Sequence, residues 1–110
     1  MNEVEQLVIK NLLLEEEYVR KALPFIKSEY FADLTGRRLF EVIHKYFTEY
    51  SAIPTKEALE IEVGQLKDIS DDQHQEIVKA INNIDTEKSE FEWILDTTEK
   101  WCKELSLIHI

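Results

Sequence analysis

The residue types best suited to chemistry in this sequence form one short cluster of acidic and imidazole side chains. Asp71, Asp72 and His74 lie within four consecutive positions, and carboxylate and imidazole groups are common ligands of divalent metal ions. The cluster follows Ser70, and carboxylates are also favoured at the positive end of a helix dipole. Because no remote residue completes a coordination shell, we interpret the cluster as the first turn of a helix and predict no metal site.

Other groups with catalytic potential are isolated along the chain. Glu15–Glu17 are adjacent, but nothing in the pattern predicts the apolar pocket that would separate two carboxyl pKa values for acid–base catalysis. The three histidines lie in separate predicted elements, and His44 has Thr48 rather than a carboxylate one turn later. Gly36 is followed by two arginines and has no second glycine in reach, so no phosphate-binding loop is present. We therefore predict no catalytic residue, no cofactor and no ATP hydrolysis.

The composition limits the fold class and the partners. The chain has 110 residues, 23 Asp and Glu against 13 Lys and Arg, a net charge of -10, and only two Gly and two Pro. Because an all-β domain uses such residues in turns every ~8–12 positions, we predict an all-α fold. The acidic balance argues against direct binding to nucleic acid or membrane and favours protein partners. One cysteine and no long apolar run predict a cytoplasmic protein.

Apolar residues recur at helical spacing in five or six segments, which predicts one compact bundle of short helices. Capping residues mark several helix starts, because Asn2, Asp33, Thr55 and Ser70 each precede an amphipathic segment. The clearest apolar stripe, which predicts the central helix, consists of Leu39, Phe40, Ile43, Phe47 and Tyr50.

The remaining segments are predicted from their boundaries. Glu15–Glu17 open a second helix, and Pro24 favours extended backbone at Leu23 and so places the end of that helix nearby. Residues 24–32 contain aromatic side chains without clear periodicity, which predicts a buried connection with one helical turn at Ser28. The other expected boundaries are a helix end near Gly64, a turn at residues 82–85, and a last helix that begins around 86–89 and reaches at least Leu105.

The last predicted helix carries the candidate interface. Ile94, Thr98, Trp101 and Leu105 recur at spacings of 4, 3 and 4, which is the seam of a coiled-coil-like helix pair. One interpretation is that this seam covers the core of the domain. The other is that the helix faces a partner, because Trp is enriched in interface hot spots. The candidate protein-interface residues are Phe91, Trp93, Ile94, Trp101 and Leu105.

The order of these core positions resembles a known family. The segments that carry the resemblance are Val8–Leu14 with Tyr18, Pro24-Phe25, Ser28–Phe31, Arg38–Phe40 with Ile43, Tyr46 and Tyr50, Ile53–Thr55 with Ala58-Leu59, Trp93–Leu95 and Thr98–Trp101. This order and spacing is similar to the N-terminal domain of replicative helicases of the DnaB type, in the version found in T-even-like phages. The resemblance runs from about Val4 to Cys102 and contains no single diagnostic motif.

The resemblance implies a fold, a function and partners. Residues 1–87 would form the helical bundle core and 88–105 the first helix of a truncated helical hairpin. Residues 106–110, including His109, depart from the expected charged continuation, and we interpret them as a truncated reading frame or non-native sequence. In such helicases this non-catalytic domain forms a collar on a hexameric ring, pairs subunits and contacts primase. DNA translocation and ATP hydrolysis belong to a separate motor domain.

Two other classes of function fit the sequence. The first is a free-standing acidic phage protein that acts as an adaptor or inhibitor by binding a basic surface of a host protein. The second is a small hydrolase with an unrecognised carboxylate site. The charge also predicts that added salt strengthens self-association of the collar domain, because it screens the repulsion between acidic copies.

Overall fold

The computed structural model describes residues 1–108, with side chains through Ser106, and all regular structure in this part of the chain is helical. The predicted all-α fold is confirmed. The elements, in chain order, are α1 (Glu3–Leu14), α2 (Glu16–Ala22), the 3-10 turns η1 (Leu23–Phe25) and η2 (Ser28–Tyr30), α3 (Leu34–Tyr50), α4 (Lys56–Gly64), α5 (Asp71–Asn82) and α6 (Phe91–Ile108). The 3-10 turn η2 confirms the helical turn predicted at Ser28, and His109 lies outside the described residues.

The predicted capping residues begin four of the helices. The side chains of Asn2, Asp33, Thr55 and Ser70 each accept a hydrogen bond from the backbone N–H three residues further on, at 2.9 to 3.2 Å. Gln73 returns the contact by accepting from the Ser70 backbone N–H at 3.2 Å, which completes a capping box. Local side-chain chemistry therefore sets where these helices start.

Helix α6 begins later than predicted and, as predicted, reaches at least Leu105. It begins at Phe91, later than the predicted 86–89, because the Glu90 carboxylate accepts from the backbone N–H groups of Glu92 and Trp93 at 3.2 and 2.8 Å. It continues to Ile108, which places three residues of the predicted tail at 106–110 in the helix.

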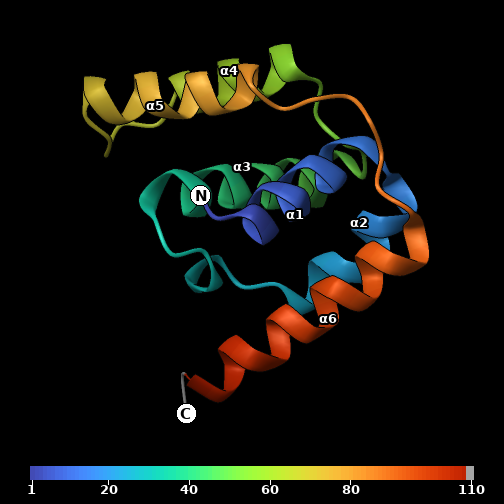
Figure 1. The fold of residues 1–110 in the computed structure, drawn as a ribbon. Coiled ribbons are helices and arrows are strands. Elements are labelled where there is room, and N and C mark those ends of the chain that lie inside the picture. The colour runs from blue at the N-terminus through green and yellow to red at the C-terminus, as the bar shows by residue number, and fades with distance from the viewer. Residues whose placement is uncertain (109–110) are drawn as a thin grey trace.

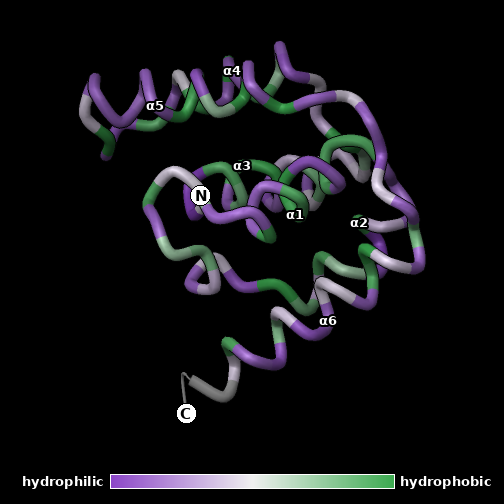
Figure 2. Tube along the Cα trace, in the orientation of Figure 1, coloured by the Kyte–Doolittle hydropathy of each residue, from purple (hydrophilic) through white to green (hydrophobic). Residues whose placement is uncertain are grey.

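The helices form three layers (Figure 1). The antiparallel pair α4 and α5 covers one side of α3, α1 packs beside α3 in the middle, and α6 crosses the opposite side, where it contacts α1, α2 and η2. Along each helix the hydrophobic positions alternate with hydrophilic ones (Figure 2), as expected for elements that bury one face. Of the predicted central stripe on α3, Leu39, Phe40 and Ile43 are buried, whereas Tyr50, in the last turn, is exposed.

The connection after α2 corrects two predictions. Leu23 has helical rather than extended backbone, with φ -53° and ψ -42°, because its side chain is buried in the core and the chain tightens into a 3-10 turn despite Pro24. The predicted buried connection holds for Ile26, Tyr30 and Phe31, but Phe25 is 72% exposed. Three residues make one turn of a 3-10 helix, so Leu23 and Ile26 share the inward side and Phe25 points away from it.

Candidate protein-interaction surface

The seam predicted on the last helix packs on the core of this same chain. Ile94 is 1% exposed and Trp101 is 9% exposed, and Thr98 between them is also buried. The Trp101 ring makes edge contacts with the rings of Tyr30 and Phe31, at centroid distances of 6.0 and 5.2 Å. Ile94 and Trp101 therefore face the bundle, as the first of the two interpretations of the seam expected.

Two polar contacts attach α6 to the bundle. The hydroxyl groups of Tyr18 and Thr98 lie 2.7 Å apart and are both buried. The Asn11 side chain donates to the Ser89 hydroxyl at 3.1 Å and accepts from the Ser89 backbone N–H at 3.2 Å. Sequence reasoning did not identify Asn11 as a contact, although its place on the apolar stripe of the first helix was the signal. Together these contacts hold α6 and the segment before it against α1 and α2.

A buried carboxylate supports the aromatic residues under α6. Glu5 is buried in α1, and its Oε1 accepts a hydrogen bond from the backbone N–H of Ala32 at 3.1 Å. The guanidinium Nε of Arg37 donates to the carbonyl of Phe31 at 2.8 Å. These contacts hold the segment that presents Tyr30 and Phe31 to Trp101. The role of Glu5 was also missed in the sequence, where its acidic side chain suited an exposed first turn.

The other candidate interface residues lie on different sides of α6. Trp93 is 49% exposed, whereas Phe91 and Leu105 are partly buried against the core. The Lys21 ammonium lies 5.4 Å from the centre of the Phe91 ring, a cation–π contact that joins α2 to α6. Successive helical residues are rotated by about 100°, so Trp93 and Leu95 project from opposite flanks of the inward stripe. The five candidates do not form one patch.

An apolar groove of about 600 Å³ runs along the Leu95 flank of α6. Its lining residues are Lys21, Ala22, Phe25, Tyr30, Leu95, Thr98, Glu99, Cys102, Lys103 and Ser106. Burial raises the pKa of the Cys102 thiol to about 11. The groove was not predicted, because it depends on the outward orientation of Phe25 and on the way α6 docks against η1.

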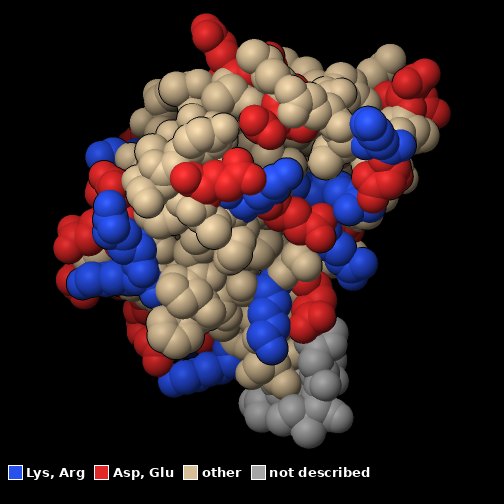
Figure 3. All heavy atoms as spheres, turned by 180° about the vertical axis from the view of Figure 1, so that it is seen from behind, with Lys and Arg blue, Asp and Glu red and all other residues tan. Residues whose placement is uncertain are grey.

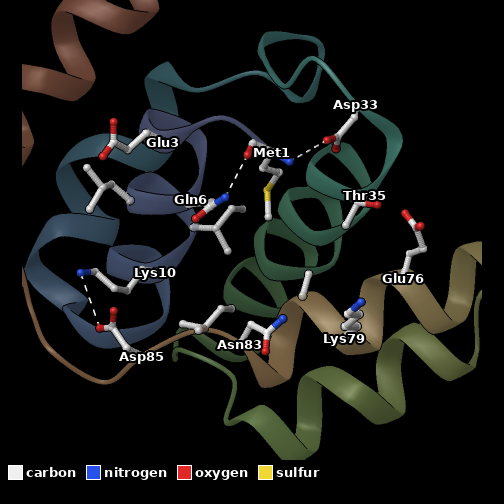
Figure 4. A pocket seen from close by; sticks show the side chains of 14 residues that line it. Met1, Glu3, Gln6, Lys10, Asp33, Thr35, Glu76, Lys79, Asn83 and Asp85 are labelled. Carbon is white, nitrogen blue, oxygen red and sulfur yellow. Dashed lines mark hydrogen bonds and ion pairs between the residues drawn. The ribbon is translucent and has the colours of Figure 1, made fainter.

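A second, polar cleft of about 510 Å³ lies between α1, the start of α3 and α5 (Figure 4). The Met1 amino group contacts Asp33 at 2.9 Å and Lys10 contacts Asp85 at 3.7 Å. The hydrogen bond with Asp33 raises the pKa of the amino group despite some burial. Burial opposes ionisation of Asp33, but hydrogen bonds from Gly36 and the amino group hold its carboxyl pKa below the usual range. The first contact attaches the N-terminus to the start of α3, and the second joins α1 to the segment after α5.

The residues that the sequence offered as metal ligands or catalytic groups lie outside these two grooves. Asp71 and Asp72 are exposed in the first turn of α5 and His44 is exposed on α3, in agreement with their interpretation as helix-start and surface residues. Within residues 1–108, no group of three or more His, Cys, Asp and Glu side chains could hold a metal ion. No helix among the described residues is long and apolar enough to cross a membrane.

Charged side chains of both signs are interleaved around uncharged surface on the face opposite to that of Figure 1 (Figure 3). Ion pairs join side chains on neighbouring turns within α2 and within α6, with nitrogen–oxygen distances of 2.7 to 3.0 Å. Exposed pairs of this kind contribute little to stability. This face presents no extended basic area.

Two exposed aromatic side chains lie at the last helix, Trp93 on α6 and Phe25 beside it. In sequence, the chain is similar to the DnaB-like replicative helicase of Enterobacteria phage T4, with 19% identity over 104 residues. The similarity covers 94% of this chain and 22% of the T4 protein, so the chain spans about a fifth of the length of that relative. No family model matches the sequence. The chain is thus distantly similar to a phage replicative helicase.

Proposed function

We propose that this chain is the N-terminal collar module of a phage-type replicative DNA helicase. In this role it joins subunits of a hexameric ring and contacts primase or other replisome proteins in the cytoplasm of the infected bacterium. The observation that carries the proposal is the similarity to the T4 helicase over 94% of the chain. Because the chain corresponds to 22% of that protein, ATP hydrolysis and translocation on DNA are assigned to the remainder, and this module is non-catalytic.

The surface chemistry supports a role in protein contacts. With a net charge of -10, the domain repels phosphate groups over most approach directions. Subunit pairing needs apolar side chains that remain accessible once the domain has folded. Trp93 is half-exposed on α6, whereas Ile94 and Trp101 are committed to the core. We therefore assign the pairing contact to the Trp93 side of α6, whereas Phe91 and Leu105, which pack partly against the core, lie away from that side.

Sedimentation velocity of the 110-residue chain tests this assignment. The informative variant is Trp93→Asp, because Trp93 is exposed and its replacement leaves the core intact, whereas Trp101→Asp would put a carboxylate into the core. Ile61→Asp on α4 is the matched control, since Ile61 is 62% exposed. We expect the parent chain and the control to self-associate and Trp93→Asp to weaken association by about tenfold or more. A parent chain that remains monomeric at millimolar concentration would contradict the pairing role.

Salt provides a second test of the same contact. Each copy carries a charge of -10, so pairing brings two acidic domains together. Raising NaCl from about 0.05 M to about 0.5 M shortens the Debye length from about 14 Å to about 4 Å and should strengthen self-association. Association that weakens with salt would instead show that specific ion pairs hold the copies together.

A second candidate function is a free-standing acidic adaptor or inhibitor that binds a basic surface of a host protein. The burial of Ile94 and Trp101 favours it, because the inward face of α6 is covered without a second helix. The open reading frame at the native locus distinguishes the two candidates. Continuation into a phosphate-binding loop supports the helicase, and a stop codon soon after Leu105 supports the adaptor.

A further inference from the structure

The apolar groove beside α6 has the length of a short helix. Its α6 wall extends from Leu95 to Ser106, twelve residues that span about 16 Å of helix, or three helical turns. Phe25 forms part of the opposite wall and is 72% exposed, so a large apolar ring at the edge of the groove remains in contact with solvent. A bound segment would cover the Phe25 ring and complete its burial.

The charges at the groove are opposite in balance to those of the whole chain. The lining contains two lysines, Lys21 and Lys103, and one carboxylate, Glu99, although acidic residues outnumber basic ones 23 to 13 overall. Lys103 pairs with Glu99 at 2.8 Å. Lys21 forms no ion pair with any residue in the described part of the chain, and its ammonium lies over the Phe91 ring. The walls therefore offer positive charge beside apolar surface.

We propose that this groove docks an amphipathic helix of another protein, whose apolar stripe is flanked by Asp and Glu residues. Apolar residues at helical spacing would contact Phe25, Leu95 and Cys102, and the acidic flank would pair with Lys21, because Lys103 is already paired with Glu99. An extended peptide fits less well, because the walls are helices and provide no strand edge for main-chain hydrogen bonds.

Charge also decides between another protein and a second copy of this chain. A two-fold contact between two grooves would use the same surface on both copies and bring the lysine-bearing walls together. Both copies would also carry a charge of -10, so the approach is unfavourable at long and at short range. The inference goes beyond the proposed pairing role, because Trp93 lies on the opposite flank of α6 and is not part of the groove.

A displayed library of helical peptides tests the proposal while the partner itself is unidentified. Each peptide is about four turns long, with a fixed leucine stripe and with randomised flanking positions, and selection is made against the 110-residue chain. We expect the selected flanks to be enriched in Asp and Glu over Lys and Arg. Enrichment of basic flanks, flanks without charge bias, or a failure to select any binder would overturn the proposal.

Three variants then locate the binding of one selected peptide. Phe25→Ser should weaken its affinity by at least about tenfold and Lys21→Glu by about threefold or more, whereas Ile61→Ser, another exposed apolar residue, should leave it unchanged. Because Phe25 is exposed, circular dichroism melting should show that Phe25→Ser is folded. Bound peptide should also slow the reaction of the Cys102 thiol, which lines the groove, with a disulfide reagent.

The same variants provide outcomes that contradict the proposal. Peptide affinity that is unaffected by Phe25→Ser, or a Cys102 reaction rate that is unaffected by bound peptide, would place binding elsewhere. Self-association of the chain that is lost in Phe25→Ser but kept in Trp93→Asp would assign the groove to a second copy. Loss of self-association in Trp93→Asp alone supports the pairing role of Trp93 and contradicts occupation of the groove by a second copy.

Discussion

The hydrogen bond between Tyr18 and Thr98 should be energetically important for holding α6 on the bundle. The two hydroxyl oxygens lie 2.7 Å apart in the core. Tyr18→Phe removes one of them and leaves the Thr98 hydroxyl without its partner, and the net value of a hydrogen bond is about 1 kcal/mol. The Thr98 hydroxyl can turn to a carbonyl one turn earlier in its own helix, which limits the penalty. We expect the free energy of unfolding to fall by about 1–2 kcal/mol.

Thr98→Val and the double variant separate the hydrogen bond from the cost of an unpaired hydroxyl. Thr98→Val keeps the shape of the side chain but leaves the Tyr18 hydroxyl buried without a partner, at a cost of about 2 kcal/mol. The double variant removes both hydroxyls and leaves no unpaired group, so it should lose only about 1 kcal/mol relative to the parent. The expected coupling between the two sites is therefore about 2–3 kcal/mol.

Urea unfolding followed by far-ultraviolet circular dichroism measures all four proteins. For a chain of this size a loss of 1 kcal/mol corresponds to about 4–8 °C in Tm, so thermal melting provides an independent check. Tyr46→Phe is the control, because Tyr46 is only partly buried on α3 and loss of its hydroxyl should cost less than about 0.5 kcal/mol. Additive losses in the double variant would refute the hydrogen bond as the link between α2 and α6.

Three further predictions concern pH, glycine positions and the second polar contact of α6. Burial raises the pKa of Tyr18, so above pH ~10 the unfolded chain releases this proton first and stability falls with rising pH; urea midpoints should show a smaller fall in Tyr18→Phe. Gly36→Ala should destabilise the protein by about 1–3 kcal/mol, because the added Cβ meets the Phe31 ring at 3.0 Å. Gly64→Ala has only one neighbour, at 3.8 Å, and should be neutral or stabilise the protein by up to about 1 kcal/mol. A melting temperature that is lower for Gly64→Ala than for Gly36→Ala would contradict this packing. Asn11→Ala removes both hydrogen bonds to the segment before α6 and should cost about 2–3 kcal/mol by urea unfolding, and a loss below about 0.5 kcal/mol would show that the contact is dispensable.

The features of the fold that depend on neighbouring residues could be predicted from the sequence. Asn2, Asp33, Thr55 and Ser70 begin helices because each side chain reaches a backbone N–H only three positions away. The start of α6 was placed too early, because Glu90 is a less usual capping residue than Ser or Thr at the predicted positions. Periodicity and capping thus determine the number and approximate bounds of the helices.

The candidate site depends on tertiary packing, and the sequence predicted it only in part. Periodicity showed that Ile94, Thr98 and Trp101 share one face of a helix but not whether the chain itself covers that face. Its covering depends on the Tyr30 and Phe31 rings, which are presented by an irregular segment. Buried polar contacts such as that of Asn11 are equally hard to predict, because a polar residue on an apolar stripe has no determined partner until the fold is known.

The burial of the inward face limits how strongly this module can associate through α6. Ile94 and Trp101 contribute to the stability of the domain, and their apolar area is no longer available to a partner. A contact on the Trp93 flank would therefore be small and weak in a single pair, because one half-exposed tryptophan provides a single anchor. In the ring of the proposed function, the rest of the protein would hold each copy beside its neighbours, and the high effective concentration would make weak contacts sufficient. Under the proposed function, the collar contact would then stabilise an assembled ring more than it would drive assembly from free subunits.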